Sequence, residues 1–449
     1  MVAAVGKVDS SRLVMTSMLV ENEPSQRERS GPGTGDGRIA SGAAGDVVDT
    51  TTERSTKRRR APMLPMPLTL AVLGLTYWCV DIASPALPVI QSDLGLSGAG
   101  TGLLMSIFFF GRLLTNVPAA WLIDRIGPRG CALIGAIVLG LGSAGAALAP
   151  AELPLLVARG LQGGGVALLA TAGLLSVLRA RSGHGAAMTA FNVAAGVGGS
   201  FGLFTGGLVT TELGWRSVFW LCAGLALVML LGTLLARTTR AGRRPDDLVL
   251  TDEAEPPEPP AMSRGLFAAL AANLLVYGNY GIWVVALALF AAGRFGAGPA
   301  ELGTLLLVVN LIHLLAALPV GRAIRRLGAA PALAVGFAVA AAGIGAALLT
   351  PSFGWLFPPM ALYAVGQITS NSAAGDLVLR LGGGAGRAVG LLRFTSDVGL
   401  VVGPLLIGLL ADLAGVGAPF LVLCGLTATG AIATWLLGGR SARVRPAMP

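Results

Sequence analysis

WLIDRIGPR, at residues 121–129, is a short charged stretch between two apolar segments of about 20 residues each. A later apolar segment carries Arg159, Gln162 and Gly163 in the order Arg-x-x-Gln-Gly. An arginine deep in hydrocarbon is costly, and such residues mostly face a protein interior or a water-filled path. Together the two patterns predict a membrane protein with a polar interior, and they favour a transporter over an enzyme.

The composition is that of a bilayer protein. Hydrophobic residues make up 54% of the 449 residues and charged residues 12%, against about 25% charged residues in soluble proteins. The mean hydropathy is +0.75. Apolar stretches long enough to cross a bilayer predict an all-α integral membrane fold with twelve transmembrane helices in two sets of six. The predicted spans are residues 66–90, 100–122, 130–149, 154–178, 187–211, 216–236, 266–292, 299–321, 331–350, 354–378, 387–411 and 417–438.

The basic residues predict the orientation of these spans, because Lys and Arg concentrate in cytoplasmic loops. Nearly all of the 32 Lys and Arg fall in short segments on one side of the predicted membrane. Arg216 and Arg294 fall on the opposite side, and Arg112, Arg159 and Arg393 lie within spans. Both termini are therefore expected to be cytoplasmic. The net charge of +9 does not indicate nucleic-acid binding, since it is spread along one side of the membrane.

Composition also divides the chain into parts. Residues 1–62 are rich in Gly, Ser, Thr and charge and lack a signal-peptide cleavage site, so a disordered cytoplasmic tail is expected. An alternative is that the protein starts at Met63. The four cysteines lie far apart without metal-ligand spacing and are expected to be reduced packing residues; no metal or cofactor is indicated. We expect a six-helix bundle at 63–237, a polar linker at 238–264, a second bundle at 265–438 and a cytoplasmic tail at 439–449.

The second half of the chain repeats parts of the first at one constant offset. The stretch 118–127 aligns with 319–328, and both contain a proline, an isoleucine, an arginine and a final glycine at matching positions. Gly202 meets Gly403 and Gly207 meets Gly408 at the same offset, without a gap. An internal duplication explains these matches.

The stretch 121–129 resembles the signature loop of the major facilitator superfamily, Gly-x-Leu-Ala-Asp-Arg-x-Gly-Arg-Arg. Arg159-x-x-Gln162-Gly163 resembles the fourth-span signature of the same superfamily. The loop departs from the pattern at Ala120 and Pro128. The resemblance implies parallel six-helix repeats about an axis along the membrane normal, substrate bound at mid-membrane between them, and a monomer.

The first predicted span carries Asp81 followed by Ala86-Leu87-Pro88, which looks like the first-span pattern of the drug/proton antiporter branch. The fifth span resembles the antiporter signature Gly-Pro-x-x-Gly-Gly, with Leu203 in place of the proline. Burial disfavours a charged carboxylate and a nearby cation favours it, so an acid beside a movable arginine can act as a proton switch. We therefore expect Asp81 and Arg159 to couple protons to transport.

Five charged residues lie inside predicted spans and away from the span ends, and each costs about 2.5–3.5 kcal/mol at the centre of a lone helix. They are Asp81, Arg112, Arg159, Arg393 and Asp397. They must be paired or face a watery cavity. One interpretation of Arg393 and Asp397 is a fixed ion pair within one helix, since they are four residues apart. Asn116 shares the helix face of Arg112, and both are expected on the substrate side.

Further site residues are expected in three groups. The resemblance assigns an inner-gate role to Asp124, Arg125, Gly127 and Arg129. Small residues at close-packing spacing predict helix contacts at Gly202, Gly206, Gly207, Gly403, Pro404 and Gly408. The expected substrate cavity comprises Arg112, Asn116, Gln162, Asn192, Tyr277, Asn279, Asn310, His313, Gln367, Asn371, Arg393 and Asp397.

These patterns favour a proton-coupled exporter of drugs or small-molecule metabolites in the plasma membrane. A proton-coupled importer of an organic acid or sugar-like nutrient is the alternative, and a transport-dead receptor or assembly partner is a third reading. Lys7 and Lys57 are the only lysines and lie outside any phosphate-binding loop, so no ATPase is indicated. The expected partners are a small-molecule substrate, protons and the lipid bilayer.

Overall fold

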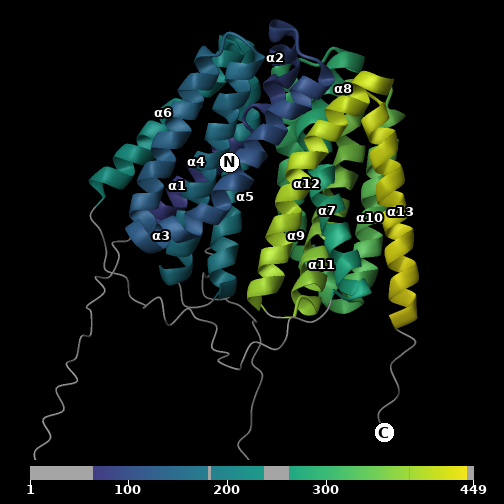
Figure 1. Ribbon diagram of the computed structural model, residues 1–449. Helices are drawn as coiled ribbons and strands as arrows, with labels where there is room; N and C mark the ends of the chain where they lie inside the picture. Colours follow the sequence, from purple (N-terminus) through teal and green to yellow (C-terminus); the bar gives the residue numbers. More distant parts are fainter. Residues whose placement is uncertain (1–63, 181–183, 237–261, 384, 442–449) are drawn as a thin grey trace, which may run out of the picture. The chain divides into compact units, whose positions relative to one another are not determined.

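The computed structural model describes residues 64–180, 184–236, 262–383 and 385–441. All regular secondary structure in these ranges is helical (Figure 1). The expected tail at 1–62 lies outside the described residues, as do most of the linker at 238–264 and of the tail at 439–449. The helices are α1 (Met66–Asp81), η1 (Ser84–Ala86), α2 (Leu87–Leu94), α3 (Gly98–Leu148), α4 (Glu152–Ala180), α5 (His184–Leu213), α6 (Trp215–Leu235), α7 (Arg264–Gly281), η3 (Ile282–Ala286), α8 (Leu287–Phe295), α9 (Pro299–Leu327), α10 (Ala329–Leu348), η4 (Phe353–Leu356), α11 (Phe357–Leu381), α12 (Ala385–Ala414) and α13 (Ala418–Ser441).

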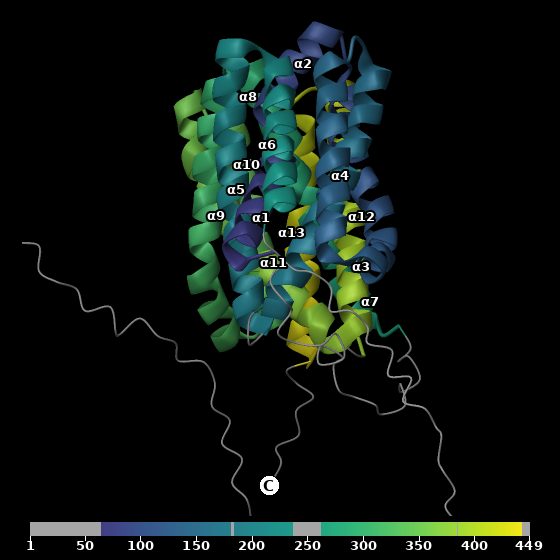
Figure 2. The same cartoon turned by 90° about the vertical axis from the view of Figure 1, so that its left-hand side faces the viewer.

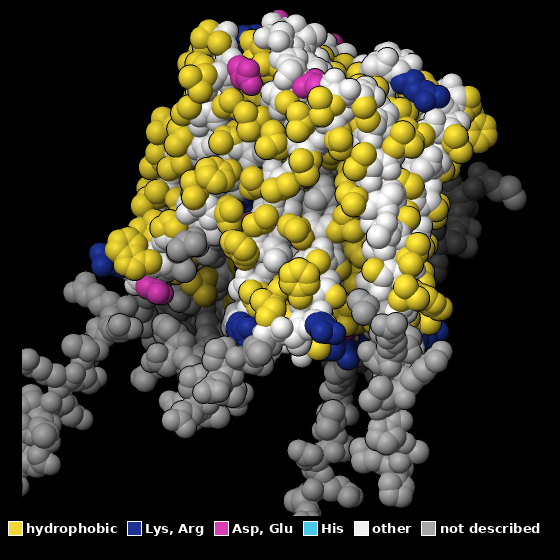
Figure 3. Space-filling view, turned by 45° about the vertical axis from the view of Figure 1, so that its right-hand side comes forward, with side chains coloured by type: hydrophobic (Ala, Val, Ile, Leu, Met, Phe, Trp, Pro, Cys, Tyr) yellow, Lys and Arg dark blue, Asp and Glu magenta, His cyan; other side chains and the backbone are white. Residues whose placement is uncertain are grey.

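Eleven stretches of the described chain are long and apolar enough to cross a membrane. The predicted span at 354–378 corresponds to α11, which is not one of the eleven, since Gln367, Ser370 and Asn371 make its middle polar. Large hydrophobic side chains such as Leu148 and Leu153 are exposed, as expected where lipid replaces water around the protein. On the face shown in Figure 3, hydrophobic side chains spread along the side of the molecule, whereas most of the visible Lys and Arg lie near its two ends.

We call α1–α6 the N-terminal half and α7–α13 the C-terminal half; Figures 1 and 2 show the two groups from different sides. Three pairs of glycines with positive φ recur at the constant offset found in the sequence: Gly95 and Gly296, Gly127 and Gly328, Gly214 and Gly415. Their φ angles lie between 62° and 87°. This region strongly favours glycine. The same turn conformation therefore occurs at corresponding places in the two halves.

The stretch 121–129 is less of a loop than its sequence suggests. Helical structure runs through it within α3 except at Gly127, whose φ is 77° and ψ 169°. Pro128 then begins the next helical segment, where its missing N–H is not needed. The loop that the resemblance predicts is therefore reduced to one non-helical residue, Gly127. We refer to the two ends of the helix bundle as the Gly98 end and the Gly127 end.

The first and seventh spans are both interrupted near their middle. In the first, the 3₁₀ turn η1 separates α1 from α2, because Pro85 and Pro88 lack the N–H groups that a continuous helix needs. In the seventh, the π-helical segment η3 separates α7 from α8. The two interruptions contact each other. Irregular backbone at membrane depth is tolerated when protein surrounds it, and such places often carry function.

Glycines allow several helices to approach backbone to backbone. Along α5, a Cβ atom at Gly198, Gly202 or Gly206 would collide with backbone atoms of α1 or of the residue after it. Between the halves, a Cβ at Gly207 or Gly408 would collide with the carbonyl oxygen of Pro299 or Gly98. Gly403 lies against Gly278 within the C-terminal half, and the Pro404 carbonyl lies against Gly102 of α3. Each glycine predicted for helix packing thus lies where a side chain does not fit.

Candidate functional site

Asp81 lies at the end of α1, where the first span is interrupted. Its side chain is buried, with a relative exposure of 9%. The hydroxyl of Tyr280, in the C-terminal half, donates a hydrogen bond of 2.5 Å to Asp81 Oδ2. Asp81 Oδ1 is buried and has no hydrogen-bond partner among the described residues. The interruption of α1 therefore presents a carboxylate to the other half, with one of its oxygens unsatisfied.

Aromatic rings surround Tyr280. Its ring stacks against that of Trp283 with centroids 6.5 Å apart, and it lies edge-on to Phe109 at 6.0 Å. Trp283 in turn lies edge-on to His313 at 5.7 Å. His313 Nδ1 is buried without a hydrogen-bond partner among the described residues. Tyr280, the partner of Asp81, is therefore packed between rings of both halves, Trp283 of η3 and Phe109 of α3.

Arg159 belongs to a different network within the N-terminal half. It is 1% exposed, and its guanidinium donates to the Leu104 carbonyl at 3.3 Å and to Gln162 Oε1 at 2.9 Å. Its charge also lies 4.5 Å from the centre of the Phe108 ring. Gln162 Nε2 donates to Ser143 Oγ at 2.8 Å. In this conformation Arg159 therefore has amide, carbonyl and aromatic partners, and its expected role with Asp81 in proton coupling stays a prediction.

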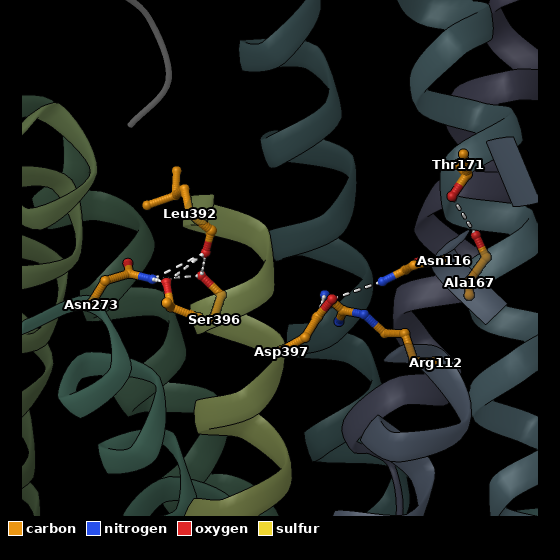
Figure 4. A network of polar contacts seen from close by, with 9 residues as sticks. Arg112, Asn116, Ala167, Thr171, Asn273, Leu392, Ser396 and Asp397 are labelled. Atoms are coloured by element: carbon orange, nitrogen blue, oxygen red, sulfur yellow. Dashed lines mark hydrogen bonds and ion pairs between the residues drawn. The ribbon is translucent and has the colours of Figure 1, made fainter. Parts of the chain in front are cut away.

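Asp397 of α12 joins the halves at a second place (Figure 4). Its Oδ1 accepts from Arg112 Nη2 at 3.1 Å, and its Oδ2 accepts from Asn116 Nδ2 at 2.8 Å. Arg112 and Asn116 lie on one face of α3, as their spacing predicts. The ion pair within α12 considered above is wrong for this structure, because α12 packs against α3 and turns Asp397 toward Arg112. Arg393 is exposed.

The other expected cavity residues are dispersed. Asn279 donates to Thr427 Oγ1 at 2.9 Å and Gln367 to the Val276 carbonyl at 2.6 Å, both within the C-terminal half. Asn310 crosses between halves and donates to Ser200 Oγ at 2.9 Å. The remaining three differ in exposure: Asn192 is exposed, and Tyr277 and Asn371 are half-buried.

The expected inner-gate residues lie near the Gly127 end. Asp124 is exposed, and the Arg125 guanidinium lies 3.9 Å from the centre of the Trp121 ring. Arg129 donates to the carbonyls of Thr233 and Leu234, at 3.1 and 2.9 Å. These carbonyls belong to the last turn of α6, so Arg129 caps that helix within the N-terminal half. A gating role for these residues stays a prediction.

Sequence reasoning missed two polar residues that join different helices. Asn273 of α7 donates to Thr395 and Ser396 of α12, at 2.8 and 3.0 Å, and is fully buried (Figure 4). Asp412 of α12 accepts from the backbone N–H groups of Gly98 and Ala99 in the other half. An acidic side chain at the end of an apolar span was the available signal for Asp412.

A family model described as Major Facilitator Superfamily matches residues 69–271 and 268–447. The chain belongs to the major facilitator superfamily. This superfamily member is a transporter and not an enzyme, and it is a multi-pass protein of the plasma membrane. The predictions of family, class and location are confirmed.

Relatives of this transporter include drug-resistance proteins. Puromycin resistance protein pur8 of Streptomyces alboniger is 36% identical over 169 residues, which are 36% of this chain and 33% of pur8. Multidrug resistance protein Stp of Mycobacterium tuberculosis is 31% identical over 174 residues, 37% of this chain and 32% of Stp. The chain thus matches about a third of each relative's length. The expected resemblance to drug-efflux members is confirmed.

Solved transporters share the fold. Nucleoside transporter NupG superposes with a TM-score of 0.68 at 12% identity, covering 83% of this chain and 99% of NupG. A bacterial homologue of the human lysosomal transporter Spinster, in an inward-facing and occupied conformation, gives a TM-score of 0.66 at 18% identity, covering 84% and 96%. At these identities the likeness establishes the fold alone.

Proposed function

We propose that this protein exports drugs or small-molecule metabolites in exchange for protons, by alternating access. Drug resistance is the activity named for pur8 and Stp, the relatives that match part of this chain. One proton entering along a membrane potential supplies about 2.3 kcal/mol per 100 mV. That energy corresponds to about a fifty-fold concentration ratio. One proton per cycle therefore suffices for uphill export.

Asp81 is the observation that carries this proposal. It is a buried carboxylate whose described partner, Tyr280, belongs to the other half. Protonation removes a charge that burial penalises and gives the carboxyl group an O–H that can donate. Gain or loss of one proton therefore changes the bond that joins the two halves at mid-membrane. In another step of the cycle Arg159 takes the place of Tyr280 as the partner of Asp81.

The proposal includes an arrangement of the chain in the membrane. The helix α11 serves as a twelfth span, with its polar middle turned toward protein neighbours, since Gln367 and Ser370 are buried. The two halves, 63–237 and 265–438, are six-helix repeats joined by a cytoplasmic linker, and both termini are cytoplasmic. The Gly127 end is then cytoplasmic and the Gly98 end faces outward.

The conformation fits the inward-facing step of such a cycle. Asp81–Tyr280, Arg112–Asp397 and Asn310–Ser200 join the halves in the middle of the bundle. Backbone contacts join the halves at the Gly98 end, through Gly207 and Gly408. In the outward-facing step Asp124, Arg125, Gly127 and Arg129 close the opposite end. The predicted cavity residues that join the halves, Arg112, Asn116, Asn310 and Asp397, then line the path between them.

Transport into inside-out vesicles tests the function. We expect an imposed proton gradient to drive uptake of cationic dyes or of members of a metabolite panel by the wild-type protein. The Asp81→Asn variant loses this uptake. The matched control is Asp93→Asn, which changes an exposed aspartate at the end of the same span, paired with Arg216 at 3.0 Å, and keeps it.

The outcomes separate the alternatives. Gradient-dependent uptake only in right-side-out vesicles would support the importer instead. Gradient-driven accumulation by a folded Asp81→Asn variant would refute the role of Asp81 while leaving export standing. A folded protein that moves no compound in either orientation would refute the exporter proposal.

A further inference from the structure

At the Gly98 end of the bundle, a carboxylate joins the two halves, and the transport proposal gives it no role. Asp412, near the end of α12, accepts hydrogen bonds from the backbone N–H groups of Gly98 and Ala99, at 2.6 and 2.7 Å. These are the first two residues of α3. Each oxygen of the Asp412 carboxylate thus accepts a hydrogen bond from one backbone N–H at the start of α3, in the N-terminal half.

A second contact of the same kind lies at the corresponding place in the repeat. Thr211, near the end of α5, accepts a hydrogen bond from the backbone N–H of Ala300 at 3.1 Å. Thr211 corresponds to Asp412, and Ala300 to Ala99, at the constant offset of the two halves. Ala300 is the second residue of α9. A side chain near the end of one helix therefore caps the start of a helix in the other half at two places. The Asp412 carboxylate of α12 caps α3, and the Thr211 hydroxyl of α5 caps α9.

We propose that Asp412 and Thr211 form an outer latch, which holds the Gly98 end closed and breaks when that end opens. The proposal rests on alternating access as proposed above. Asp412 contributes most of the hold, because an ionised acceptor at a helix N-terminus binds amides more strongly than a hydroxyl does and faces the positive end of the helix dipole.

The helices that carry the latch are packed backbone against backbone. A Cβ at Gly98 would lie 2.7 Å from both Asp412 Oδ1 and the Gly408 carbonyl oxygen. On the Thr211 side, a Cβ at Gly303 would lie 2.8 Å from the Leu203 carbonyl oxygen. Helices in such contact separate as units. Opening the Gly98 end therefore requires α12 to leave α3 and α5 to leave α9, which breaks both parts of the latch.

Distance measurements between the halves test this proposal without substrate and without a proton gradient. Spin labels are placed at Ser92 and Ser352, exposed residues of the N- and C-terminal halves, after replacement of the four native cysteines. We expect Asp412→Asn to raise the ratio of long to short distances about ten-fold, and Thr211→Val to raise it about two- to three-fold. Gly98→Ala disrupts the contact from the other half and shifts the ratio in the same direction.

Glu301→Gln is the matched control. Glu301 Oε2 accepts from the Gly298 N–H at 2.9 Å, so it also caps a helix near this end, but the helix is its own. Its distance distribution should equal that of the wild type. Unchanged distributions in both folded Asp412→Asn and Gly98→Ala would overturn the latch, and an effect of Thr211→Val as large as that of Asp412→Asn would overturn its asymmetry. Neither result depends on whether Asp81 carries a proton.

Discussion

Tyr280 of α7 donates a hydrogen bond to Asp81 at the end of α1, and this bond crosses between the two halves at the interruptions of both spans. An interrupted helix leaves backbone and side chains free to rearrange, which an uninterrupted span does not. The proposed proton site therefore also links the two halves that move in the proposed transport cycle.

Replacing Tyr280 by Phe removes the donor and keeps the ring. We expect Tyr280→Phe to slow gradient-driven transport about ten-fold, because a hydrogen bond to a carboxylate is lost. The change should have little further effect in an Asp81→Asn background, since the two residues act together. Tyr363→Phe is the control: it loses a buried hydrogen bond of 2.7 Å to the Asn279 carbonyl, not to a carboxylate. Equal losses in both variants would argue against a special role for Tyr280.

The Arg112–Asp397 pair should couple the stability of the two halves. Asp397 is 6% exposed and Arg112 25%, so removal of either partner leaves a poorly solvated charge. In a double-mutant cycle with Arg112→Ala and Asp397→Ala, followed by unfolding in detergent, we expect a coupling of about 1–3 kcal/mol. The pair Arg380–Asp376, at 2.9 Å, serves as reference, since its arginine is 70% exposed, and it should give about 0.3–0.5 kcal/mol. A coupling no larger than the reference value would show that the pair contributes little.

Glycine packing along α5 gives a prediction about stability. Gly202→Ala places a Cβ against the Trp78 carbonyl, and we expect a loss of about 1–3 kcal/mol in the free energy of unfolding. Gly224→Ala on α6 has open space around its Cβ and should be neutral or stabilising by up to about 1 kcal/mol. Both are read from chemical unfolding in the same detergent. A stable Gly202→Ala variant would mean that α1 and α5 can move apart at no cost.

The network around Arg159 depends on the shape of the guanidinium as well as its charge. Arg159→Lys keeps the charge but cannot reach Gln162 Oε1 and the Leu104 carbonyl with one planar group. We expect transport to fall at least ten-fold, measured in the vesicle assay. Arg294→Lys, which changes an arginine that donates to the Leu348 carbonyl near the Gly98 end, should stay near the wild-type rate. Full activity of Arg159→Lys would show that transport needs only the positive charge at this position and not the hydrogen bonds of the guanidinium.

Much of the fold follows from the sequence. The thickness of a bilayer determines the length of an apolar helix, and glycine permits the positive φ angles found between successive helices. The spans and the turn at Gly127 were predictable on these grounds. The interruption after Asp81 was not predicted, although Pro85 and Pro88 signal it. The weak apolar character of α11 follows from its polar middle, whose neighbours are known only from the structure.

The site was predictable as a set of residues but not as a set of contacts. Charged residues in apolar spans singled out Asp81, Arg112 and Asp397. Their partners depend on which helices pack together, and sequence spacing reports only neighbours on one helix. Spacing therefore allowed Arg393 as one possible partner of Asp397, whereas the structure gives Arg112. Asp412 was missed for the same reason, since its partners are backbone groups of another half.

The central claim is that Asp81 carries the proton that drives transport. Its most direct test compares uphill accumulation with substrate exchange in vesicles, for the wild type and Asp81→Asn. We predict that Asp81→Asn loses accumulation against a gradient but still exchanges labelled for unlabelled substrate, because the halves still move while no proton is coupled. Uphill accumulation that follows the proton gradient in the variant would contradict the claim.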